Sequence, residues 1–183
     1  FYDSIIPSVK ARGVGRTFLG ARCPAFAAMH LIHAYNRTAL CRHRRLEHCM
    51  KRLVATHNPG KIREYQALLA DLPLEVTWLD AEGIVFDVEE TGSTFAENAL
   101  LKAHAYAAAT GLWTWADDSG LEIDALAGRP GVFSARYAGP NASAADRYNK
   151  VLAELAPIPR AQWTARFRCA VALVEPSGVE HVV

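Results

Sequence analysis

The chain has 183 residues, of which 51% are hydrophobic and 21% charged, and its formal net charge is +1. This composition supports one well-packed core and argues against a generally basic protein that binds nucleic acid. No apolar run approaches the roughly 18 residues that a membrane-spanning helix needs, so we expect no membrane partner.

Residues 1–49 differ in charge from the rest of the chain. They carry eight Lys and Arg side chains against two acidic ones, a net +6, whereas the remainder carries 12 against 17, a net −5. An apolar strand pattern begins just after Met50, so we expect a basic N-terminal extension outside the fold (1–49), followed by a catalytic domain (50–183). An Arg-rich, acid-poor leader is typical of an organellar transit peptide, while the scarcity of Ser and Thr favours upstream sequence translated in frame.

The cysteines give no sign of a metal site or a disulfide. Cys23, Cys41 and Cys49 lie in the extension with four histidines, but their intervals do not fit the common zinc-finger spacings. Cys169 alternates within an apolar strand, where a buried free thiol is expected. The absence of a disulfide pattern fits a reducing, cytoplasmic location.

The first chemical motif follows a short strand at Leu53–Ala55. It runs Thr56-His57-Asn58-Pro59-Gly60-Lys61 and leads into a helix, because apolar residues recur at spacings of three, four and seven. A loop entering a helix N-terminus gathers backbone N–H groups and the positive end of the helix dipole, and Lys61 adds a full charge. The segment therefore suits a phosphate chain, although it lacks the Walker A spacing, and a plain strand-to-helix loop with Pro59 in the first turn is the alternative. We expect the His57 side chain to face solvent.

A second helix is predicted by the capping box Thr94-x-x-Glu97, which places its start near residue 95. The pattern is Ala-rich through residue 109 and ends at Gly111, a natural C-cap. Capping is the main role expected for Glu97. Lys102 lies on this helix, where a solvated lysine is as good an explanation as a functional one, and Glu89 and Glu90 lie on the approach loop.

The third motif is Ala116-Asp117-Asp118-Ser119-Gly120, which follows the apolar run 112–116. We interpret it as a strand that ends in a tight turn, a usual place for chemistry in an α/β protein. Neighbouring carboxylates there can hold Mg²⁺, or one can act as a base while the other binds metal. The alternative is an ordinary Asp-rich turn.

Beyond this point the sequence predicts a helix over 144–155, a strand over 163–174, a turn at 176–178 and a last strand over 179–183. Helices and strands alternate first and strands then follow one another. The expected fold class is therefore α/β, with a mixed sheet flanked by helices.

Taken together, the motifs resemble those of the Ham1/RdgB-type purine nucleoside triphosphate pyrophosphatases, also called the inosine triphosphate pyrophosphatase family. The order and spacing are similar to the family's throughout. The residues that carry the resemblance are Ala55–Lys61, Glu90–Ala99, Lys102–Ala103, Ala116–Leu121 and Gly128–Gly139.

The resemblance implies hydrolysis of non-standard purine nucleoside triphosphates (ITP, dITP, XTP) to the monophosphate and pyrophosphate. It also implies Mg²⁺ as cofactor, a homodimer, and two lobes with the site in the cleft between them. The implied roles are triphosphate binding by Thr56, His57, Asn58, Pro59, Gly60 and Lys61, phosphate contact by Lys102, substrate contact by Ser119, metal binding by Glu90 and Asp118, and activation of water by Asp118. Asp117 stays open between a second metal ligand and an orienting residue.

The sequence departs from the family in one respect. The Phe-Gly-Tyr-Asp and Ser-His-Arg motifs, which the resemblance implies grip the base, do not occur. We therefore expect either a fragment or a chain of reduced specificity. The rival interpretations are a Maf-like pyrophosphatase of other base preference and an inactive phosphate-binding fragment, with nucleic-acid binding through the basic extension a distant alternative.

Overall fold

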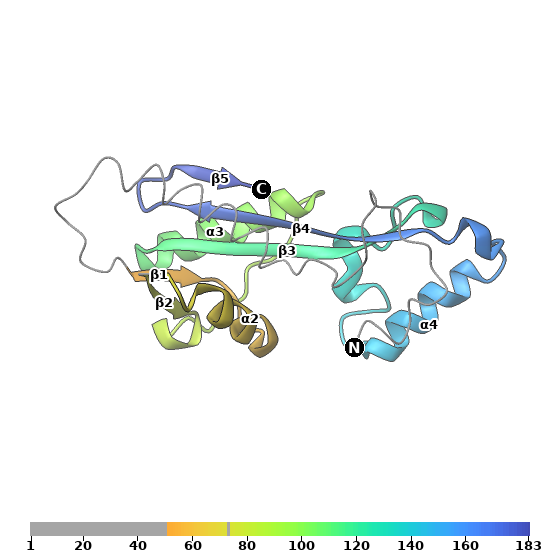
Figure 1. The fold of residues 1–183 in the computed structure, drawn as a ribbon, viewed down its shortest axis with the longest axis horizontal. Helices are drawn as coiled ribbons and strands as arrows, with labels where there is room; N and C mark the ends of the chain where they lie inside the picture. Colours follow the sequence, from red (N-terminus) through yellow and green to blue (C-terminus); the bar gives the residue numbers. More distant parts are fainter. Residues whose placement is uncertain (1–50, 73) are drawn as a thin grey trace. The chain divides into compact units, whose positions relative to one another are not determined.

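The computed structural model describes residues 51–72 and 74–183 (Figure 1), so the predictions for residues 1–49 lie outside the described residues. The described chain forms two compact units. One comprises residues 51–118 and 169–183, and the other comprises residues 119–168. Two units agree with the two expected lobes, and the central cleft stays a prediction.

A mixed sheet of five strands, in the order β2-β1-β3-β4-β5, confirms the predicted fold class. β1 pairs in parallel with both β2 and β3, while β4 and β5 are antiparallel. The strands are β1 (Lys51–Val54), β2 (Glu75–Trp78), β3 (Trp113–Ile123), β4 (Ala165–Val174) and β5 (Glu180–Val182). The predicted turn at 176–178 lies between the last two strands.

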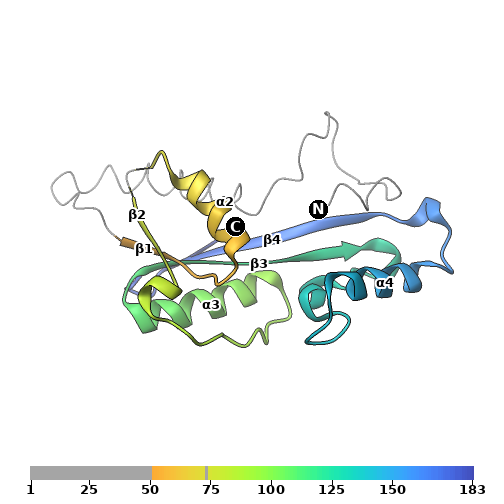
Figure 2. The ribbon, with the colours of Figure 1, turned by 90° about the horizontal axis from the view of Figure 1, so that it is seen from below.

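Two helices cover opposite faces of the sheet, α2 (Pro59–Leu69) and α3 (Phe95–Thr110), as Figure 2 shows. The pleat of the strands explains this, because successive side chains point to opposite faces. Leu53 and Ala116 belong to the core under α3, whereas their neighbours Val54 and Trp115 belong to the core under α2.

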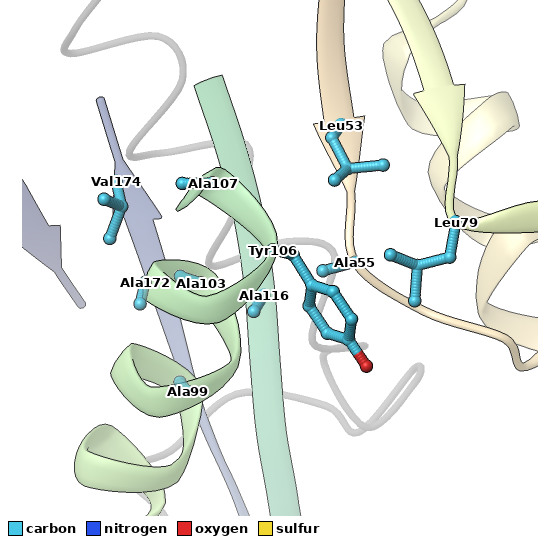
Figure 3. Packing of buried hydrophobic residues seen from close by; sticks show 10 residues of the cluster. All are labelled: Leu53, Ala55, Leu79, Ala99, Ala103, Tyr106, Ala107, Ala116, Ala172 and Val174. Carbon is cyan, nitrogen blue, oxygen red and sulfur yellow. The ribbon is translucent and has the colours of Figure 1, made fainter. Parts of the chain in front are cut away.

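Small side chains let α3 lie close to the sheet. Ala99, Ala103 and Ala107 are almost fully buried against the strands, and Tyr106 extends from the same helix face toward Ala55 and Leu79 (Figure 3). The Tyr106 hydroxyl donates to the carbonyl of Phe86 at 3.1 Å, which ties the helix to the loop before it. A 3₁₀ turn, η2 (Asp80–Glu82), leads into that loop.

The second unit has a separate core. Ile123, Leu126, Leu155 and Trp163 are buried together in it. The predicted helix over 144–155 is confirmed as α4 (Ala144–Leu155), with a capping box between Ser143 and Asp146. The remaining elements are three 3₁₀ turns, η3 (Asp124–Leu126), η4 (Gly131–Arg136) and η5 (Arg160–Gln162).

The predicted turn at 117–120 is wrong. β3 continues through Asp117, Asp118, Ser119 and Gly120 to Ile123. Aspartate, serine and glycine favour turns, but here both carboxylates are buried and hydrogen-bonded from α2 and α3. These tertiary contacts outweigh the local preference and keep the strand extended.

The capping box of α3 is confirmed, since Thr94 Oγ1 accepts from the Glu97 amide at 3.1 Å and Glu97 Oε2 accepts from the Thr94 amide. We expect Thr94→Ala to lower the free energy of unfolding by about 1 kcal/mol, because one amide of the first turn loses its partner. Thr94→Ser keeps the hydroxyl and is the matched control. Urea unfolding monitored by circular dichroism measures both, and equal losses would contradict the capping role.

Candidate functional site

The side chains of the two adjacent aspartates of β3 point to opposite faces of the sheet. The register of β1 on β3 ends with Val54 beside Trp115, and Asp117 and Asp118 follow where β1 has turned toward α2. By the period of two along a strand, Asp117 shares the α2 face with Trp115, and Asp118 shares the α3 face with Ala116. The hydrogen bonds agree, because Asp117 bonds to Lys61 of α2 and Asp118 bonds to Asn98 of α3.

Lys61 and Asp117 form a short ion pair, with Lys61 Nζ 2.5 Å from Asp117 Oδ2. The Asp117 side chain is only 2% exposed, and that of Lys61 is 27% exposed. Burial by itself would lower the pKa of Lys61, but the charge of Asp117 and the hydrogen bond to it outweigh burial, so the pKa lies above its ordinary value. This geometry favours an orienting role for Asp117 over metal binding.

The predicted phosphate loop lies between β1 and α2, as the sequence indicated. Asn58 is the N-cap of α2, with its Oδ1 accepting from the amides of Gly60 at 2.8 Å and Lys61 at 3.4 Å, and Pro59 begins the helix. Thr56 Oγ1 accepts from the Asn58 amide at 3.1 Å. These three amides are therefore used within the loop, which leaves the Lys61 ammonium, the Asn58 side-chain NH₂ and the Thr56 hydroxyl hydrogen as the groups suited to a phosphate.

His57 differs from the prediction. Its ring is only partly exposed, and Nδ1 lies 2.8 Å from Asp80 Oδ1 in the turn after β2. Nε2 lies 3.9 Å from Asp87 Oδ1. Nδ1 is therefore held by Asp80, while Nε2 is buried without a hydrogen-bond partner among the described residues, so the ring does not simply face solvent. The predicted contact of His57 with the triphosphate stays a prediction.

On the α3 face, four side chains form one linked cluster: Lys102, Glu90, Asp118 and Asn98. Lys102 Nζ donates to Glu90 Oε1 at 2.8 Å and lies 3.9 Å from Asp118 Oδ1. Asn98 Nδ2 donates to the other oxygen of Asp118 at 3.0 Å. The Lys102 side chain is 15% exposed, so the solvated alternative for this lysine is wrong.

Asn98 and Gly92 complete this arrangement, and the sequence interpretation gave neither a role. Asn98 is fully buried, and its Oδ1 accepts from the Gly92 amide at 2.7 Å. A Cβ at Gly92 would lie only 2.7 Å from that oxygen, so glycine is required for the approach. The sequence shows that Asn98 lies four residues before Lys102 on the same helical face, but only the structure shows that Asn98 is buried.

The carboxylates fit a divalent cation together with a phosphate substrate. Glu90 and Asp118 supply hard oxygen ligands on either side of the point where Lys102 now places a positive charge. Among residues 51–72 and 74–183 there is no group of three His, Cys, Asp or Glu side chains that could hold a metal alone. Mg²⁺ commonly binds through one or two carboxylates and takes its other ligands from water and phosphate, so two carboxylates are sufficient.

Ser119, the remaining predicted contact residue, directly follows Asp118 in β3 and is partly exposed. Its predicted contact with substrate stays a prediction. Cys169 is a free cysteine and is partly exposed rather than buried as expected. Within the described part of the chain, no helix has the length and apolar character needed to cross a membrane.

A strand-loop-helix segment with carboxylates and lysines, on a mixed α/β sheet, is the kind of arrangement that suits metal-assisted phosphate binding. The chain belongs to the Ham1 family, whose model matches residues 52–183. It is 53% identical over 137 residues to the dITP/XTP pyrophosphatase of Streptomyces coelicolor, covering 73% of this chain and 68% of that protein. It is 50% identical over 124 residues to the dITP/XTP pyrophosphatase of Bacillus subtilis, covering 68% of this chain and 63% of that protein.

A solved structure is also similar. The Ham1 protein of Coxiella burnetii superimposes with a TM-score of 0.66 at 43% identity, covering 73% of this chain and 68% of that one. The chain therefore spans about two thirds of the length of the relatives that it matches. The family and fold predicted from the motifs are confirmed, while the site roles stay predictions.

Proposed function

We propose that this chain carries the phosphate- and metal-binding machinery of a dITP/XTP pyrophosphatase, which hydrolyses non-standard purine nucleoside triphosphates to the monophosphate and pyrophosphate. The observation that carries the proposal is the convergence of Glu90, Asp118 and Lys102 on one point of the α3 face. The similarity to the dITP/XTP pyrophosphatases of two bacteria supports the substrate class.

The α2 side of the site is suited to the triphosphate. Lys61 brings a charge that is retained well into the alkaline range, because Asp117 raises its pKa. Asn58 and Thr56 each keep a side-chain hydrogen for a phosphate oxygen after their loop bonds are made. Since phosphoryl transfer depends mainly on positioning and charge neutralisation, a preformed loop of this kind is what the substrate requires.

The α3 side is suited to the metal and to the attacking water. Bound Mg²⁺ would neutralise the phosphate oxygens and polarise the phosphorus for attack. Glu90 and Asp118 would hold the ion, and Lys102 would then be released from the carboxylates to contact the phosphate chain. Asp118 would accept the proton of the water whose oxygen bonds to the α-phosphorus as the bond to the pyrophosphate oxygen breaks.

Product analysis tests the proposal directly. We expect the chain with Mg²⁺ to convert dITP and XTP to monophosphate and pyrophosphate, visible by ³¹P NMR, and EDTA to stop the reaction. ATP and GTP are the comparison substrates. Release of inorganic phosphate instead of pyrophosphate would overturn the assignment of the cleaved bond, and binding without turnover would favour the phosphate-binding alternative.

The homodimer implied by the resemblance belongs to this proposal as well. Light scattering on the purified chain measures the mass in solution, and a monomer at micromolar concentration would contradict it.

A further inference from the structure

We propose that Asn98 is a positioning residue that fixes both halves of the metal site, Asp118 and the loop carrying Glu90, to helix α3. The proposal rests on the metal-binding role proposed above for these two carboxylates. Asn98 does not contact the phosphate loop; it acts through the groups to which it is bonded.

The first step of the argument is the bond to Asp118. Asn98 Nδ2 donates at 3.0 Å to Oδ2, while the other oxygen, Oδ1, is the one nearer Lys102. An amide donor on one oxygen sets the rotation of the carboxylate plane and leaves the other oxygen directed at the cation position. A buried donor is effective here, because no water competes for the bond.

The second step is the bond to the loop. The Oδ1 atom of Asn98 accepts at 2.7 Å from the amide of Gly92, two residues after Glu90. One amide group therefore joins the ligand on β3 to the loop that bears the other ligand. Because Asn98 is 0% exposed and lies inside the 16-residue helix α3, this junction rests on a rigid element.

The third step is the choice of asparagine at position 98. The site needs a donor toward Asp118 and an acceptor toward Gly92, and a side-chain amide supplies both in one planar group. Aspartate would oppose the Asp118 charge, and alanine or leucine would leave a buried carboxylate oxygen and the partly buried Gly92 amide without these partners. Groups that orient metal ligands typically change metal affinity by about 10–100-fold when removed.

The experiment measures binding of Mn²⁺ alone, as a spectroscopic substitute for Mg²⁺, by electron paramagnetic resonance on the full chain. We expect Asn98→Ala to weaken Mn²⁺ binding about 10–100-fold. Gly92→Ala, whose Cβ would press on Asn98 Oδ1 and also on Glu97 Cβ and the Asn98 amide nitrogen, should weaken it in the same direction and provides a second test if Asn98→Ala does not fold. Tyr106→Phe removes another hydrogen bond between α3 and the same loop and should leave Mn²⁺ affinity unchanged.

A double-mutant cycle separates positioning from general destabilisation. In an Asp118→Asn background, adding Asn98→Ala should weaken Mn²⁺ binding less than it does in the unaltered chain, because one of the two groups through which Asn98 acts is gone and only the bond to the Gly92 amide remains to be lost. Additive effects, or wild-type affinity in folded Asn98→Ala, would overturn the inference while leaving the proposed function standing. Absence of Mn²⁺ binding by the unaltered chain would overturn both.

Discussion

Asp118→Asn is expected to lower the rate of pyrophosphate release by at least about 1,000-fold while the protein stays folded. The substitution removes the proposed metal ligand and the group proposed to take the proton of the attacking water, and proton transfer by a positioned base alone contributes about 10²–10⁴-fold. Folding should survive because the amide has the same shape and its oxygen can still accept from Asn98 Nδ2.

The measurement is pyrophosphate release from dITP and XTP under saturating Mg²⁺, with a thermal melt of the same sample. Asp71→Asn, the same chemical change at an exposed position just after α2, is the matched control and should retain full activity. Turnover of Asp118→Asn within tenfold of the unaltered chain would remove Asp118 from the catalytic role.

The Lys61–Asp117 pair is expected to give the second large effect. Lys61→Met should lower the free energy of unfolding by about 3 kcal/mol, because it leaves the Asp117 carboxylate buried without its cation. The double variant Lys61→Met/Asp117→Asn carries neither charge and should recover most of that loss. Its affinity for the triphosphate should nevertheless remain about 10–100-fold weaker, since a charge-assisted bond to phosphate is worth about 1.5–3 kcal/mol.

The comparison of the single and double variants separates stability from binding. Urea unfolding gives the free energy of unfolding, and KM for dITP and XTP reports on substrate binding. The rise in KM should be equal for both substrates. Wild-type KM in the double variant would show that Lys61 serves only the fold.

The single variant Asp117→Asn tests the cause of the raised pKa of Lys61. Without the Asp117 charge, burial is no longer opposed, so the pKa of Lys61 should fall. In the unaltered chain the raised pKa means that the ion pair stabilises the fold below the ordinary pKa of 10.5 and is lost as pH rises through the folded value. We therefore expect KM of Asp117→Asn to rise at a lower pH than KM of the unaltered chain.

The elements could largely be predicted from the sequence. The capping box Thr94-x-x-Glu97 placed the start of α3 and Gly111 placed its end, both as observed. The helix over 144–155 also agrees with α4. These signals are local, because a cap and a helical period involve residues within a turn or two of each other, and so they are readable without the fold.

The family was likewise determined by the sequence, because five motifs in a fixed order are jointly specific where each alone is not. The strand end at Asp117–Asp118 was misread for the converse reason. Local preference favours a turn there, whereas the hydrogen bonds from Lys61 and Asn98, 56 and 20 residues away along the chain, hold it in β3.

The tertiary structure decided which side chains Asp117 and Asp118 contact. The period of two says that Asp117 and Asp118 point to opposite faces, but it requires knowing that the strand continues through them. Only the fold places α2 on one face and α3 on the other. Asp117 therefore pairs with Lys61, whereas Asp118 contacts Lys102 and Asn98. The sequence by itself determined the family and predicted which residues carry the chemistry. The packing of two helices on opposite faces of one sheet decided which of them meet, because those contacts join residues far apart in the chain.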